Sequence, residues 1–89
     1  TPRNRTYALA IADRFDAFAN AYDQMSIFVQ NTLNQNVARY GKRHPGRNQN
    51  RVFYNATANN MLALMTSLLQ SRNSQYERAR QYRRAAARL

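Results

Sequence analysis

Apolar residues recur at alternating intervals of three and four along the first part of the chain, which is the spacing of a heptad seam. This pattern predicts a helix over about residues 6–40. Thr6 is suited to the N-cap, and Gly41 is suited to the position just beyond the helix end. The predicted seam consists of Ala8, Ile11, Phe15, Phe18, Tyr22, Met25 and Val29, followed after a one-residue slip by Leu33, Val37 and Tyr40.

The second part of the chain has a weaker pattern of the same kind. It is interrupted by a polar run at residues 70–75 and then continues as an Ala, Tyr and Arg tail. A second helix is predicted over about residues 51–87, with Asn48 or Asn50 as its N-cap. Its best apolar stripe consists of Tyr54, Ala58, Met61, Met65 and Leu68.

A strong turn signal separates the two predicted helices. Residues 41–50 contain both glycines and Pro45. We therefore predict an all-α, single-domain antiparallel hairpin: a basic arm (1–5), a first helix (6–40), a basic turn (41–50) and a second helix with its arginine-rich tail (51–89). Tyr40 and Tyr54 flank the turn and are expected to pack on each other. Weak helix formers at 31–36 and 70–75 leave open a compact three- or four-helix bundle.

The hairpin is predicted to need neighbouring copies. Only about 18% of the chain is Leu, Ile, Val or Phe, a low fraction for a packed core, and a chain of this size buries roughly 60–65% of its unfolded surface. Aspartates on the face opposite the predicted seam have no obvious partner within the hairpin, so they are expected to contact arginines of an adjacent copy. The predicted subunit contacts are Asp13, Asp16, Asp23, Phe15, Phe18 and Tyr22, of which the three aromatic residues also belong to the predicted core seam.

Charge points to a polyanionic partner. Fourteen lysines and arginines oppose four carboxylates, for a net charge of +10, and thirteen of the fourteen are arginines. Arginine forms forked hydrogen bonds with phosphate and stacks on bases, so nucleic acid is the expected partner, with double-stranded DNA favoured and gripped by its backbone. The predicted contacts are Arg3, Arg5, Lys42, Arg43, Arg47, Arg51, Arg72, Arg78, Arg80, Arg83, Arg84 and Arg88.

Residues for catalysis are scarce. The chain has no cysteine and one histidine, His44, so we expect no enzyme activity, no metal, no cofactor and no small-molecule substrate. The longest apolar run, 7–12, is too short to span a bilayer, and a membrane partner is not favoured. Asn4 and Asn55 begin glycosylation sequons, for which the asparagine-rich composition is a sufficient explanation.

The segment Arg3-Asn4-Arg5, the basic turn Lys42–Arg51 and the tail Tyr76–Leu89 resemble the DNA-wrapping major coat proteins of archaeal rod-shaped and filamentous viruses. The resemblance extends over the whole chain as a pattern and includes no diagnostic motif. It implies a virion protein that sheathes the genome with antiparallel helices in many copies. Two alternatives are a nucleoid-associated or regulatory protein of the cytoplasm or nucleoid, and a basic amphipathic helical protein acting on membranes.

Overall fold

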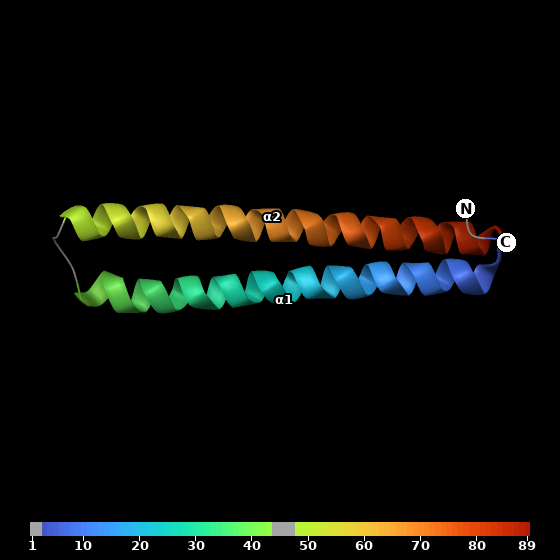
Figure 1. The fold of residues 1–89 in the computed structure, drawn as a ribbon, viewed down its shortest axis with the longest axis horizontal. Coiled ribbons are helices and arrows are strands. Elements are labelled where there is room, and N and C mark those ends of the chain that lie inside the picture. The colour runs from blue at the N-terminus through green and yellow to red at the C-terminus, as the bar shows by residue number, and fades with distance from the viewer. Residues whose placement is uncertain (1–2, 44–47) are drawn as a thin grey trace.

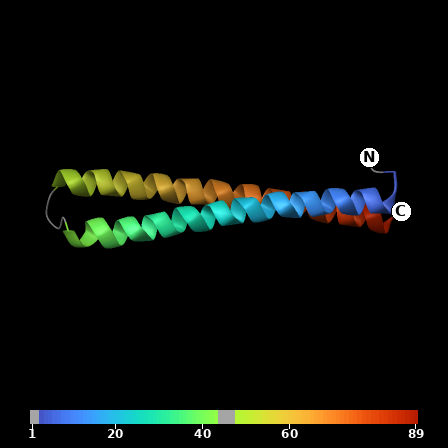
Figure 2. The same cartoon turned by 60° about the horizontal axis from the view of Figure 1, so that its bottom comes forward.

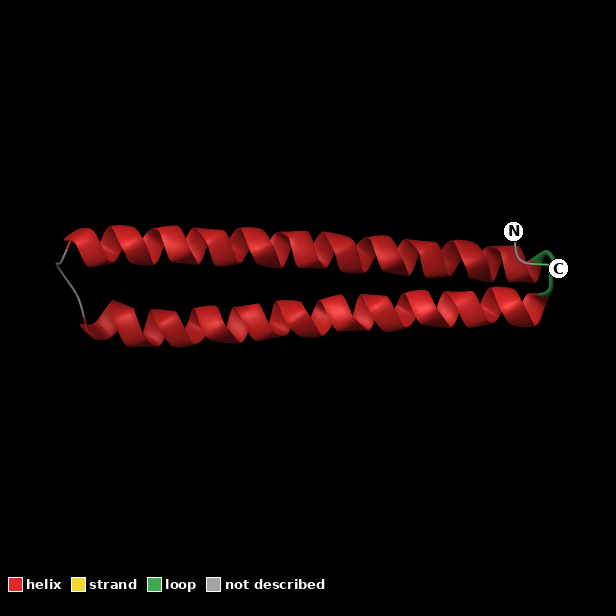
Figure 3. Cartoon of the chain, in the orientation of Figure 1, coloured by secondary structure: helices red, strands yellow, loops and turns green. Residues whose placement is uncertain are grey.

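Two long helices form an antiparallel hairpin in this computed structural model (Figures 1 and 3). The structure describes residues 3–43 and 48–89, with side chains for residues 3–36 and 56–89. Helix α1 spans Arg5–Arg43 and helix α2 spans Asn48–Ala87. The Cα atoms extend over 64 × 15 × 12 Å. The predicted fold class is therefore confirmed, with helices slightly longer than expected.

Both helices run without interruption through the polar segments where a break was considered. In α1, the amide nitrogen of Asn36 lies 3.9 Å from the sulfur of Met61 in α2. In α2, Arg72 from the second polar segment forms an ion pair with α1. These segments are weak helix formers by only a few tenths of a kcal/mol per residue, and packing between the helices overrides that preference. The broken three- or four-helix bundle is therefore wrong.

The helix ends differ from the predicted ones in two places. Asn4, not Thr6, caps α1: the Tyr7 backbone N–H donates to the Asn4 side-chain oxygen at 2.7 Å. Helix α1 continues past Gly41 to Arg43, so this glycine does not follow the helix end. The side chains that would cap α2, and the predicted contact of Tyr40 with Tyr54, lie outside the described residues.

The seam of α1 is regular and small. Ala8, Ala12, Ala19 and Ser26 are its buried residues. Between them lie partly buried residues at 15, 22 and 29, and the same three- and four-residue spacing continues to 33 and 36 without the predicted slip. The prediction is correct at Ala8, Phe15, Tyr22, Val29 and Leu33. It is wrong at Phe18 and Met25, which are exposed because Ala19 and Ser26 occupy those places in the seam. Ile11 is partly buried beside Ala12.

Helix α2 continues the predicted stripe through its polar segment. Ala79 and Ala86 are buried, and Tyr82 stacks on Phe15 with ring centroids 5.6 Å apart. Its seam consists of Ala58, Met61, Met65, Leu68, Arg72, Gln75, Ala79, Tyr82 and Ala86. Seen from a second direction, the two helices cross at a small angle (Figure 2). A seam that repeats every seven residues drifts slowly around a straight α-helix, so two helices that keep such seams in contact wind around each other.

Alanine and serine form the buried core of this hairpin. Among the described residues, no large side chain is completely buried. Small side chains let the two helices approach closely, but they remove little apolar surface from water. The larger apolar residues lie at the margins of the seam, where one partner helix covers only part of each. The core is consequently thin along the whole rod.

Candidate nucleic-acid interface

The antiparallel arrangement gathers arginines at the end of the rod where both termini lie (Figure 1). We call this end the terminal pole. Each of its arginines is exposed, and most lie in the last turns of α2. The antiparallel hairpin thus brings the basic arm and the basic tail to the same end. The terminal pole consists of Arg3, Arg5, Arg78, Arg80, Arg83, Arg84 and Arg88.

Arginines of the α2 tail point in several directions around the helix axis. Successive residues of an α-helix are separated by about 100°, so the spacing from Arg78 to Arg88 spreads the guanidinium groups around the helix. Just beyond them, the backbone N–H of Leu89 donates to the Ala86 carbonyl at 3.1 Å. The terminal pole therefore presents cations toward more than one side.

One arginine of the terminal pole forms ion pairs between the two helices. Arg83 in α2 bonds Asp13 in α1 at 3.1 Å and also pairs with Asp16. The hydrogen bond that Arg83 donates to Asp16 raises the pKa of Arg83 above its ordinary value; Asp13 adds to this effect, and partial desolvation opposes it. Arg83 is thus a poorer candidate for phosphate binding than its neighbours.

A single glutamate, Glu77, lies within ion-pair distance of two further arginines of the terminal pole. Arg80 bonds Glu77 at 2.9 Å, and Arg84 lies 4.0 Å from the same carboxylate. Both pairs lie within α2 and are exposed, so each stabilises the fold by at most about 1 kcal/mol. A phosphate can compete for these guanidinium groups at little cost, since one carboxylate does not neutralise two cations.

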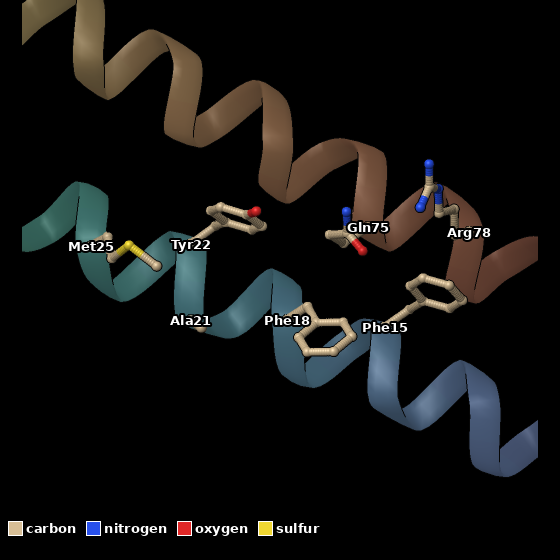
Figure 4. A pocket seen from close by; sticks show the side chains of 7 residues that line it. All are labelled: Phe15, Phe18, Ala21, Tyr22, Met25, Gln75 and Arg78. Carbon is tan, nitrogen blue, oxygen red and sulfur yellow. The ribbon is translucent and has the colours of Figure 1, made fainter.

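Several arginines of the described segments have no carboxylate partner there. Arg78 instead lies over the ring of Phe15, with its guanidinium carbon 5.8 Å from the ring centroid (Figure 4). The members of the terminal pole that have no carboxylate partner among the described residues are Arg3, Arg5, Arg78 and Arg88. They are the best-placed phosphate contacts of the described residues.

The acidic residues of α1 do not point away from the hairpin. Asp23 bonds Arg72 at 2.7 Å, and both side chains are about one third exposed. Together with the Asp13 and Asp16 pairs, this corrects the expectation that the three aspartates lack partners in their own chain. Their predicted contact with another copy remains a prediction. The corrected seam explains the geometry, because Asp16 and Asp23 each directly follow a seam residue.

The turn end of the hairpin carries the other predicted phosphate contacts. The backbones of Lys42 and Arg43 belong to α1, and that of Arg51 belongs to α2. Their side chains, with all of His44 and Arg47, lie outside the described residues. The proposed basic pole at the turn therefore remains a prediction from sequence.

An open apolar groove of about 410 Å³ lies along one flank of the seam (Figure 4). Residues that flank a seam on opposite sides stand just before and just after it, so this groove lies on the flank away from the aspartate–arginine pairs. Sequence reasoning missed it, because it wrongly assigned two of its lining residues, Phe18 and Met25, to the seam itself. The groove is lined by Phe15, Phe18, Ala21, Tyr22, Met25, Gln75 and Arg78.

Within the described segments, no three histidine or acidic side chains come together as metal ligands. Neither helix, over those same residues, combines the length and apolar character needed to cross a bilayer.

Comparisons of the chain with protein-family models, curated proteins and solved structures found no match.

Proposed function

We propose that this protein is a structural subunit that packages nucleic acid, binding the phosphate backbone of duplex DNA in many copies. The observation that carries the proposal is the terminal pole. Seven exposed arginines gather there, and four of them have no carboxylate partner among the described residues. Such unneutralised cations on a rigid helical support favour a polyanion.

The amount of charge supports a coat of many copies. A duplex as long as this 64 Å rod carries roughly 38 phosphates, at one negative charge per 1.7 Å of axis. One chain contributes a net charge of +10. About four chains would therefore neutralise each rod length of duplex. Closely spaced copies along the nucleic acid are thus favoured over a single bound subunit.

Backbone contact is favoured over base reading. Arginines spread around the end of α2 can meet phosphates from several directions, and forked guanidinium groups suit phosphate oxygens. Sequence-specific readers instead direct a few side chains of one element into a groove. Within this proposal the protein is a virion component, as its resemblance to DNA-wrapping coat proteins implies.

The test is binding to duplex DNA of arbitrary sequence over a range of salt concentrations. We expect affinity to fall steeply with salt and to depend little on sequence. Arg88→Gln should reduce the slope of log affinity against log salt by about 0.9, the value for one lost phosphate contact. Arg72→Gln is the control: it removes an arginine in the middle of the rod, away from the terminal pole, that already pairs with Asp23, so it should leave the slope nearly unchanged.

Negative-stain imaging of the same mixtures tests packaging directly. Regular filaments with DNA are the expected result, whereas discrete complexes with a defined footprint would indicate a regulator. Absence of binding to DNA and RNA at low ionic strength would refute the proposed function.

A further inference from the structure

This hairpin leaves more surface in water than a compact protein of its mass. Its accessible surface is 6905 Å². A folded monomer of 10.4 kDa is expected to expose about 5,400 Å². The excess of about 1,500 Å² is nearly twice the roughly 800 Å² that a standard interface removes from one partner. The rod therefore has enough surplus surface for contact with more than one neighbour.

A row of exposed apolar residues lies on one flank of α1. Phe18 is 56% exposed, Met25 is 47% exposed and Phe28 is 71% exposed. These residues alternate with the exposed Ala21 at spacings of three and four, so they form a second stripe beside the seam. The open groove runs along the same flank (Figure 4). We call this surface the α1 flank: Phe18, Ala21, Met25 and Phe28.

Charge favours α1 as the place where two copies meet. Between residues 6 and 36, α1 carries three aspartates and one arginine, whereas α2 carries most of the positive charge. Two chains of net charge +10 repel each other wherever their basic parts approach. The α1 flank is bordered by Arg14 and Arg78, and Arg78 already lies over Phe15. An antiparallel contact through this flank keeps the two arginine-rich tails at opposite ends of the dimer. It also places the basic arm of each copy opposite residues 38–40 of the other, so salt should strengthen the contact.

The α1 flank is also complementary to itself. In an antiparallel pairing of two α1 helices centred beside Ala21, residues equidistant from the centre face each other. Phe18 of each copy then meets Met25 of the other copy, which gives aromatic–sulfur contacts of a favourable kind. The small Ala21 lies at the centre, where the two helices approach most closely. An isologous two-fold contact requires this correspondence of residues.

We propose that a second copy of this chain occupies the groove, with the two α1 helices antiparallel and centred beside Ala21. The dimer is a four-helix unit with two α1 helices inside and the α2 tails outward. This inference deepens the proposed function, because it locates one contact of the assembly. Its test contains no nucleic acid, so it fails or succeeds independently of DNA binding.

The first experiment measures self-association by analytical ultracentrifugation of the full chain in high salt without nucleic acid. Phe18→Asp should weaken the dimer by at least tenfold, about the cost of losing a central apolar anchor. Ile27→Asp is the matched control, since it places the same charge on the same helix at an exposed apolar residue outside the flank. A wild-type chain that stays monomeric at all concentrations, or equal weakening by both substitutions, would overturn the proposal.

The second experiment does not depend on a destabilising substitution. Because the chain has no cysteine, Ala21→Cys introduces a single thiol at the proposed centre. Mild oxidation should convert this variant to a covalent dimer, while Ala17→Cys, exposed on another face of α1, should not react comparably. Equal cross-linking of both variants would refute the centred pairing. Unchanged association of Phe18→Asp with a loss of DNA binding would assign the groove to nucleic acid instead.

Discussion

Replacement of Ala19 by leucine tests the seam on which the hairpin depends. Ala19 is completely buried, and so is Ala79 of the seam in α2. Leucine adds three carbon atoms at a place where small side chains let the helices approach. Overpacking of this kind typically costs about 1–3 kcal/mol in free energy of unfolding. A domain of 89 residues has roughly 4–13 kcal/mol in total, so the loss is a large fraction.

Urea denaturation followed by circular dichroism at one protein concentration measures this loss. With a slope of about 1 kcal/mol per molar urea, the midpoint should fall by roughly 1–3 M. Holding concentration constant matters, because association also stabilises the folded state. Ala17→Leu is the matched control: Ala17 is exposed on the same helix, and alanine and leucine differ little in helix propensity. Its free energy of unfolding should change by less than about 0.5 kcal/mol.

The two possible seams give opposite results for this substitution. If Phe18 occupied the seam, as the sequence pattern suggested, Ala19 would lie beside it and leucine there would be tolerated. An Ala19→Leu variant as stable as the wild-type chain, or no less stable than Ala17→Leu, would refute the alanine seam and the exposed α1 flank with it.

Two further substitutions test contacts at the ends and in the middle of the hairpin. Asn4→Ala should lower the free energy of unfolding by about 1 kcal/mol, because it removes the side-chain acceptor for the Tyr7 N–H. Thr6→Ala should lower it less. If urea denaturation gives the reverse order, Thr6 is the cap. Asp23→Asn should lower the free energy of unfolding by up to about 1 kcal/mol, because it weakens the partly buried ion pair with Arg72. A double-mutant cycle with Arg72→Gln should give a coupling energy that high salt reduces. Zero coupling at low salt would show that the pair contributes nothing to stability.

Secondary structure and topology were accessible from the sequence because they depend on local signals. Periodicity at three and four residues predicted both helices, and one cluster of glycine and proline predicted the turn between them. Antiparallel helices of similar length necessarily bring the two ends of the chain together, so the convergence of Arg3 with Arg88 at one end also followed. The helix cap was misplaced by two residues, since Asn4 and Thr6 are both suitable caps.

The exact seam was not accessible, and the positions of the aspartates followed from the same error. Apolar residues of α1 cover an arc wider than one partner helix needs, and the sequence pattern identifies the middle of that arc. Large residues such as Phe18 and Met25 then appear to be better core positions than Ala19. The structure places α2 to one side of the arc, which buries the alanines and brings Asp16 and Asp23 within reach of arginines.

The sequence by itself determined that this chain is helical, folds back on itself once and concentrates positive charge in its arm, turn and tail. Those properties arise from spacing, turn residues and composition along the chain. Only the tertiary structure decided which side of α1 meets α2, which arginines are held by carboxylates and which apolar side chains remain in water. Which face of α1 packs against α2 depends on how closely the two helices can approach. Small side chains at the contact permit a close approach, and the apolar pattern of one helix does not reveal it.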